Sequence, residues 1–125
     1  CPVVLTGGTI RPKRMDLCGI VALNNLGRYN FTRAVLGTDG ITADGTLTTT
    51  DEETSLLAAA AVEHSQSVLI LADSSKLDRS SFVPYGALRG EKFTLITDSQ
   101  ADPAVLETLR KLGINIILAD AAKIK

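Results

Sequence analysis

The sequence predicts an α/β protein with a mostly parallel sheet and helices on both of its faces. Five short apolar runs recur along the 125 residues, separated by helical patterns or polar loops. Most runs are continuous rather than alternating, which is typical of strands that are covered on both faces. Strand and helix signals that alternate at this spacing indicate βαβ crossovers. The expected strands are residues 3–5, 34–36, 68–72, 93–96 and 114–118.

Three helices are expected between these strands. The first spans 17–26, where Leu, Ile and Val recur at helical spacing. The second spans 51–64 and starts with Thr50-Asp51-Glu52-Glu53, a capping box in which the Thr hydroxyl and a Glu carboxylate satisfy free backbone N–H groups. The third begins at Asp102-Pro103, an N-cap followed by proline, and ends at Gly113.

The composition limits the classes of function. With 45% hydrophobic residues, 22% charged residues and a net charge of -1, the chain is typical of a soluble globular protein. Its 13 basic residues are scattered and form no stripe of the kind that binds nucleic acid. Two cysteines without a C-x-x-C motif and a single histidine exclude a zinc-finger type of site. We therefore expect no metal and no cofactor.

The ends and the hydropathy of the chain suggest its setting. The sequence lacks an initiator Met and opens on Pro2-Val3-Val4-Leu5, a buried-strand pattern, so we expect further elements upstream. No apolar run has the length of a membrane span, and no signal peptide is visible. The expected location is the cytoplasm, without a membrane partner.

Polar clusters follow the expected strands. In open parallel sheets ligands bind beyond the carboxyl ends of the strands. The segments 38–50 and 73–83, both interpreted as long polar loops, begin at such ends. We therefore expect a ligand site there.

Two glycine-containing clusters are candidates, each with a plainer alternative. Thr6-Gly7-Gly8-Thr9 could turn backbone N–H groups toward an anion, or it is a tight turn. Gly37-Thr38-Asp39-Gly40 could bond a polyol through its hydroxyl and carboxylate, or it uses Asp and Gly for their turn preferences.

Two further clusters carry charge. Asp73-Ser74-Ser75-Lys76 offers a carboxylate, two hydroxyls and an ammonium, a set that suits a phosphorylated ligand, although a solvated loop is the alternative. Thr97-Asp98 lies on the same rim or caps a helix. Arg11-Pro12-Lys13-Arg14 is a small basic patch that could attract an anion, but it is better explained as a solvated loop.

Taken together and in order, the motifs resemble a known family. TGGT, AVLGTDGI, GTLTTTDEE, VLILADSSK, TLITD and GINIILAD occur at the spacing of the C-terminal sensor domain of DeoR-family bacterial repressors. The resemblance spans nearly the whole chain. That family is similar in fold to ribose-5-phosphate isomerase, glucosamine-6-phosphate deaminase and CoA-transferase subunits, which implies a Rossmann-like architecture.

The resemblance implies an effector-sensing domain of a transcriptional repressor of carbohydrate metabolism. Residues 1–125 would form a partial effector-binding domain, with a winged helix-turn-helix and the first strands upstream. The effector would be a phosphorylated sugar or related metabolite, DNA would be bound by the missing N-terminal domain, and the protein would be a homo-oligomer. The expected ligand-binding residues are Gly7, Gly8, Gly37, Thr38, Asp39, Gly40, Asp73, Ser75, Lys76 and Asp98.

Two other functions remain open. The isomerase of the related fold has acidic residues on both sides of the segment that corresponds to Gly37-Thr38-Asp39, and at these two positions this chain has Leu36 and Gly40. Moving a proton between adjacent carbons requires a positioned carboxylate, which Leu36 lacks. We therefore expect no enzyme, with a sugar-phosphate isomerase or deaminase as the alternative. The third possibility is an oligomerisation domain without a ligand.

Overall fold

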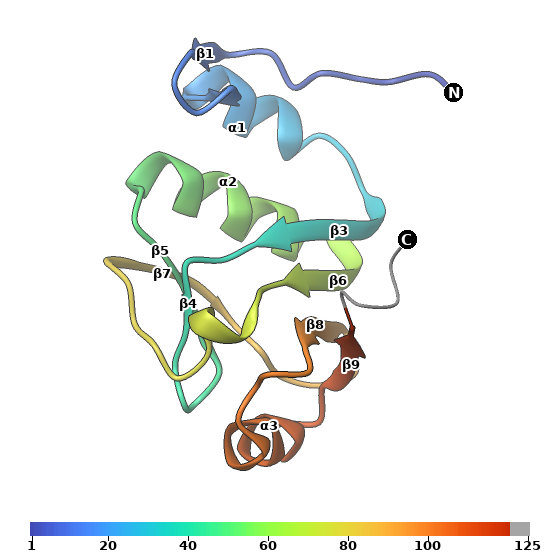
Figure 1. The fold of residues 1–125 in the computed structure, drawn as a ribbon. Helices are drawn as coiled ribbons and strands as arrows, with labels where there is room; N and C mark the ends of the chain where they lie inside the picture. Colours follow the sequence, from blue (N-terminus) through green and yellow to red (C-terminus); the bar gives the residue numbers. More distant parts are fainter. Residues whose placement is uncertain (121–125) are drawn as a thin grey trace.

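The computed structural model describes residues 1–120, and a four-stranded parallel sheet lies at its centre (Figure 1). The strand order is β3-β6-β8-β9, and all neighbours pair in parallel. Four of the five expected strands are therefore confirmed. They are β3 (Phe31–Gly37), β6 (Ser65–Leu71), β8 (Phe93–Asp98) and β9 (Asn115–Ala119).

Two of the helices lie close to where the sequence predicts them. α2 (Glu52–Glu63) begins after Asp51, whose carboxylate accepts a 2.8 Å hydrogen bond from the backbone N–H of Thr54. The prediction that Thr50 caps this helix is wrong, because its hydroxyl donates to Asp39 instead. α3 (Pro103–Arg110) begins after the N-cap Asp102, as predicted. Within the described part of the chain, no helix combines the length and hydropathy needed to cross a membrane.

The first helix is shorter than predicted. α1 (Ile20–Leu26) starts three residues late, because β2 (Asp16–Cys18) pairs with β1 (Thr9–Arg11) in an antiparallel hairpin. Between strand and helix, Gly19 adopts a φ of 92°, a backbone conformation that favours glycine. The apolar Leu17 therefore belongs to the hairpin and not to the helix.

A second sheet was not expected, and two of its three strands lie in the segment 38–50 that was interpreted as a loop. β4 (Gly40–Ile41), β5 (Thr46–Thr49) and β7 (Val83–Ala87) pair antiparallel in the order β4-β5-β7. A short 3-10 helix, η1 (Ser74–Lys76), follows β6. The strands were missed because β4 has only two residues, β5 is mostly threonine, and β7 contains proline and glycine, which are depleted in strands.

The expected strand at Val3–Leu5 is absent. The three side chains are 81%, 72% and 75% exposed, and no strand among residues 1–120 pairs with them. An apolar run forms a strand only where a neighbouring strand satisfies its backbone groups, and the described chain supplies none here.

The core occupies one face of the parallel sheet. Buried side chains of the sheet and of both longer helices form a single cluster that includes Val68, Ile70, Leu95, Ala58 and Leu106. The alternate side chains point the other way, and Val35, Leu71 and Ile117 are 57%, 46% and 52% exposed. Within residues 1–120 the prediction of helices on both faces is therefore wrong. β3 and β9 form the two edges of this sheet.

This division of the sheet predicts unequal costs for two leucine truncations. Leu95→Ala removes a fully buried side chain and should lower the free energy of unfolding by about 2–5 kcal/mol. Leu71→Ala makes the same chemical change at a half-exposed position and should cost about 1 kcal/mol or less. Urea denaturation at neutral pH measures both values, and equal losses would contradict the placement of the core.

Candidate functional site

The register of two neighbouring strands sets the position of the candidate site. Gly37 at the end of β3 lies opposite Leu71 at the end of β6. The turn Gly37-Thr38-Asp39-Gly40 and the segment Asp73–Lys76 therefore leave the sheet side by side at its carboxyl edge. Gly37 faces open space, since an added Cβ atom would meet no atom within 4 Å.

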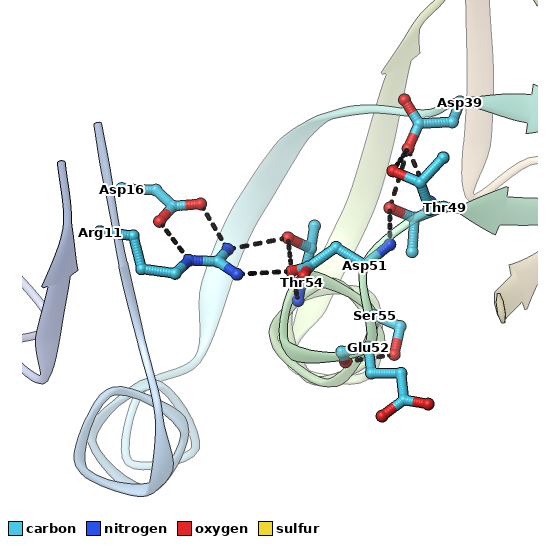
Figure 2. Close-up of polar contacts among 9 residues, drawn as sticks. Arg11, Asp16, Asp39, Thr49, Asp51, Glu52, Thr54 and Ser55 are labelled. Atoms are coloured by element: carbon cyan, nitrogen blue, oxygen red, sulfur yellow. Dashed lines mark hydrogen bonds and ion pairs between the residues drawn. The ribbon is translucent and has the colours of Figure 1, made fainter. Parts of the chain in front are cut away.

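Asp39 is held in place by hydroxyl and backbone donors. Its Oδ2 accepts hydrogen bonds from Thr49 Oγ1 at 3.0 Å, from Thr50 N at 2.8 Å and from Thr50 Oγ1 at 3.2 Å. Figure 2 shows these bonds converging on one carboxylate oxygen. The backbone bond from Thr50, the two hydroxyl bonds and the charge of Lys76 lower the pKa of Asp39 against the opposing effect of burial. Asp39 and Lys76 thus lie within electrostatic reach of each other.

The neighbours of Asp39 fix the turn itself. Thr38 Oγ1 lies 2.9 Å from the carbonyl oxygen of Thr48 and 3.1 Å from that of Gly40. The Tyr85 hydroxyl donates to the carbonyl of Gly37 at 2.9 Å. Gly40 is required by packing, because an added Cβ atom would lie 2.6 Å from the carbonyl oxygen of Arg79. Thr38 and Gly40 therefore shape the turn from within.

The segment after β6 arranges a carboxylate and an ammonium. Asp73 Oδ1 accepts a 2.9 Å bond from the backbone N–H of Ser75 and a second bond from the Ser75 hydroxyl. The Ser75 bonds lower the pKa of Asp73, with a smaller contribution from Lys76. Lys76 is partly buried, and its ammonium donates to no residue that the structure describes. Its donors remain available at this rim.

Asp98 ties the third strand end to the same segment. Its Oδ2 accepts a 2.8 Å bond from the backbone N–H of Ser74, and its Oδ1 accepts a 2.9 Å bond from Gln100 N. These backbone bonds, the one from Ser74 first, lower the pKa of Asp98. The structure thus brings Asp39, Asp73, Lys76 and Asp98 to one edge of the sheet. We call these four residues the strand-end site.

The predicted residues Gly7 and Gly8 have different neighbours. An added Cβ atom at Gly8 would lie 2.5 Å from the carbonyl oxygen of Cys18 and 2.9 Å from Ala22 Cβ. The neighbouring Thr6 carbonyl accepts a 2.7 Å bond from Asn25 Nδ2. Close packing against β2 and α1 explains Gly8, and a φ of 73° explains Gly7; the contacts of both glycines do not join them to the strand-end site. Ligand binding by Gly7 and Gly8 stays a prediction.

Sequence reasoning missed the residues that hold the site together. Thr48, Thr49 and Thr50 contact the GTDG turn from β5 and its end, and Tyr85 contacts it from β7. The threonine run in GTLTTT was a possible signal, because hydroxyls close to a carboxylate can donate to it. The sequence contains no comparable signal for Tyr85, because its contact with the turn depends on the pairing of β5 with β7.

A hollow of the molecule is lined by none of the four residues of the strand-end site. A cavity of about 510 Å³ lies between the β1–β2 hairpin, α1 and α2. Most of its wall is apolar, including Leu17, Leu57 and Ala58, with Asp16 and Thr54 among its polar residues. Such a wall offers little to a charged ligand.

The fold and the site define an α/β domain whose polar turns gather at the carboxyl edge of a parallel sheet. Sequence comparison identifies the family of α/β domains to which this chain belongs. The chain belongs to the family described as the DeoR C terminal sensor domain, whose sequence model matches residues 1–99. The resemblance of the motifs to this family is thereby confirmed.

Curated relatives of the chain are transcriptional regulators. It is 35% identical to the HTH-type transcriptional regulator GlpR of Haloferax volcanii, over 92% of this chain and 45% of that protein. It is 29% identical to the HTH-type transcriptional repressor GlcR of Bacillus subtilis, over 94% and 45%. It is 30% identical to a putative aga operon transcriptional repressor of Escherichia coli O157:H7, over 93% and 43%. The chain therefore spans a little less than half the length of these relatives.

The bonds to Asp39 predict an acid-dependent contribution to stability. Because the folded pKa of Asp39 lies below its usual 3.8, this contribution is present above that pH and is lost as the pH falls through the lowered value. Asp39→Asn should lower the free energy of unfolding by about 1 kcal/mol at pH 7 and by less at pH 3. The loss is modest because Asp39 is partly exposed and solvent weakens its interactions. Unfolding curves at the two pH values measure the difference. A loss of the same size at both would contradict the assigned role of the carboxylate.

Proposed function

We propose that this chain is the effector-sensing domain of a DNA-binding transcriptional repressor of carbohydrate metabolism. The effector is a phosphorylated sugar or related metabolite that binds at the strand-end site. The observation that carries the proposal is the pairing of β3 with β6, which brings Asp39 and the Lys76 ammonium to the same edge of the sheet.

The charges of the strand-end site favour a particular class of ligand. Three of its four side chains are carboxylates and one is an ammonium. Each carboxylate already accepts hydrogen bonds from its own loops, whereas the ammonium of Lys76 donates none to the described residues. Lys76 suits a single phosphate, and the remaining carboxylate oxygens suit sugar hydroxyls. A ligand with several phosphates would meet three negative charges, so a monophosphate with several hydroxyls fits best.

The same geometry argues against a proton-transfer enzyme. A general base that works near neutral pH is most effective when its pKa lies near that pH. The pKa of Asp39 is lowered instead, by hydrogen bonds from Thr50 and Thr49. Leu36 and Gly40, which flank the segment Gly37-Thr38-Asp39, carry no carboxylate. The site therefore supports binding better than isomerisation or deamination.

The remaining parts of the proposal rest on the family and the relatives. The chain spans less than half of regulators whose names refer to helix-turn-helix proteins, so DNA binding belongs to a part outside this sequence. Relatives named as glycerol-3-phosphate regulon repressors support a phosphorylated effector. A homo-oligomer in the cytoplasm fits this role. The expected similarity of fold to ribose-5-phosphate isomerase stays a prediction.

Lys76→Ala tests the phosphate contact. Against glycerol 3-phosphate, ribose 5-phosphate and glucosamine 6-phosphate, the variant should lose about 1.5–3 kcal/mol of affinity for whichever compound the wild type binds. Its unfolding free energy should stay within about 0.5 kcal/mol of wild type, and Lys111→Ala, at the exposed end of α3, should bind normally. Titration calorimetry measures affinity. Unchanged binding in Lys76→Ala removes Lys76 from the site.

A thermal-shift panel with the same compounds separates sensing from a purely structural role. A ligand at a hundred times its dissociation constant should add about 2.7 kcal/mol to the stability of the wild type. No stabilisation by any compound would favour an oligomerisation domain.

Incubation of the wild type with ribose 5-phosphate and glucosamine 6-phosphate should give no product above background, and turnover would instead establish an enzyme.

A further inference from the structure

A polar network joins the β1–β2 hairpin to the start of α2. Arg11, the last residue of β1, donates from Nε and Nη2 to the two oxygens of Asp16 at 2.8 and 2.7 Å. Its Nη1 donates to Asp51 Oδ2 at 2.8 Å. A guanidinium held on both sides by carboxylates has a fixed orientation, because its donors form a rigid planar fork. Arg11 therefore links segments that lie 40 residues apart in the chain.

Asp51 is the point at which this network meets the helix. Its Oδ2 also accepts from the backbone N–H and the hydroxyl of Thr54, at 2.8 and 2.7 Å. Arg11 Nη2 completes the arrangement with a 3.2 Å bond to Thr54 Oγ1. Bonds from Thr54 and Arg11 hold the pKa of Asp51 well below its usual range. The ionised N-cap and the hairpin thus stabilise each other.

The network continues from Asp51 to the strand-end site. The backbone N–H of Asp51 donates to Thr49 Oγ1 at 3.4 Å, the longest of these bonds. Thr49 Oγ1 in turn donates to Asp39 Oδ2 at 3.0 Å, and the adjacent Thr50 N–H donates to the same oxygen. Figure 2 shows the path from Arg11 through Asp51 and Thr49 to Asp39. It joins the hairpin to the site without passing through the parallel sheet.

We propose that Arg11 is a positioning residue for the strand-end site, acting through Asp51 and Thr49 on the carboxylate of Asp39. Occupancy of the site is coupled to the hairpin by the same path. The coupling to ligand rests on the proposed function, whereas the positioning of Asp39 does not. Because coupling between two sites is reciprocal, a hairpin released from α2 weakens binding, and a bound ligand secures the hairpin.

The packing around the network makes the hairpin the movable partner. The cavity of about 510 Å³ separates Leu17 of the hairpin from Leu57 and Ala58 of α2. These apolar side chains are therefore not closely packed against one another at the cavity, and the Arg11 bonds to Asp51 and Thr54 join the hairpin to α2 beside it. The tip residue Met15 is 85% exposed and has a φ of 55°. The turn of the hairpin is thus exposed, whereas its end at Cys18 is buried, so the proposed coupling concerns the turn and the Arg11 bonds.

Hydrogen exchange of the ligand-free protein tests the positioning. Arg11→Gln should speed exchange of the Thr50 amide about five-fold or more, because the carboxylate that accepts it becomes less fixed. Arg14→Gln is the matched control, since Arg14 lies in the same hairpin and its side chain makes no hydrogen bond to the described residues. Equal Thr50 exchange in wild type and Arg11→Gln overturns the proposal.

Two further variants separate positioning from general loosening of the fold. Arg11→Lys keeps the charge without the fork and should restore part of the Thr50 protection. Thr49→Val breaks the path at its middle, so Arg11→Gln combined with Thr49→Val should exchange no faster than Thr49→Val alone. Independent, additive effects would show that Arg11 does not act through Thr49. Amide exchange at Val68 in β6 should stay unchanged in every variant and reports whether the core remains folded.

The ligand arm uses glycerol 3-phosphate, ribose 5-phosphate and glucosamine 6-phosphate as probes. A compound that binds should slow exchange of the Met15 amide in wild type but not in Thr49→Val, and Arg11→Gln should weaken its binding about five-fold. Binding without any change at Met15 overturns the coupling. If the wild type binds none of the three compounds, the proposed function fails, and the positioning role is judged by the Thr50 exchange alone.

Discussion

The in-register pairing of β3 with β6 is the constraint on which the rest of the site depends. It places Gly37 beside Leu71, so that the two polar segments emerge from the sheet at the same level. A shift of one residue would turn the buried Ala34 toward solvent and Val35 into the core. Burial of one sheet face therefore fixes the register, and the register fixes the distance between Asp39 and Lys76. Hydrophobic packing sets the geometry of a polar site.

The acidic residues around the site act first as acceptors for the protein's own donors. Asp39 accepts a backbone N–H at the end of β5, and Asp51 accepts one at the start of α2. Asp73 and Asp98 each accept a backbone N–H from η1. Each of these bonds favours the ionised form, so the carboxylates stabilise the loops and stay charged at neutral pH. Lys76 differs from these four carboxylates, because its ammonium makes no hydrogen bond to the described residues. A rim built in this way is preorganised, which lowers the entropic cost of holding a ligand.

The sequence predicted those features that leave a local trace. The runs at 68–72 and 93–96 could be recognised as strands because buried strands need apolar side chains. The proline after Asp102 marked the start of α3. Asp39, Lys76 and Asp98 were predicted at one edge because strand ends of a parallel sheet coincide. Thr49 and Tyr85 could not be predicted, since their partners depend on a small antiparallel sheet. The run at 3–5 was misjudged because hydropathy gives a preference for burial and not the presence of a neighbour.

The outer edge of β3 affects how this chain behaves in concentrated solution. β3 has seven residues and a partner on only one side within the described sheet, and Val35 projects from it into solvent. The unpaired N–H and C=O groups of such a border are a template for strand addition by another polypeptide. Leu71 and Ile117 are further exposed apolar side chains on the same face of the sheet. Any segment or partner that covers β3 would therefore also prevent the addition of a foreign strand at this edge.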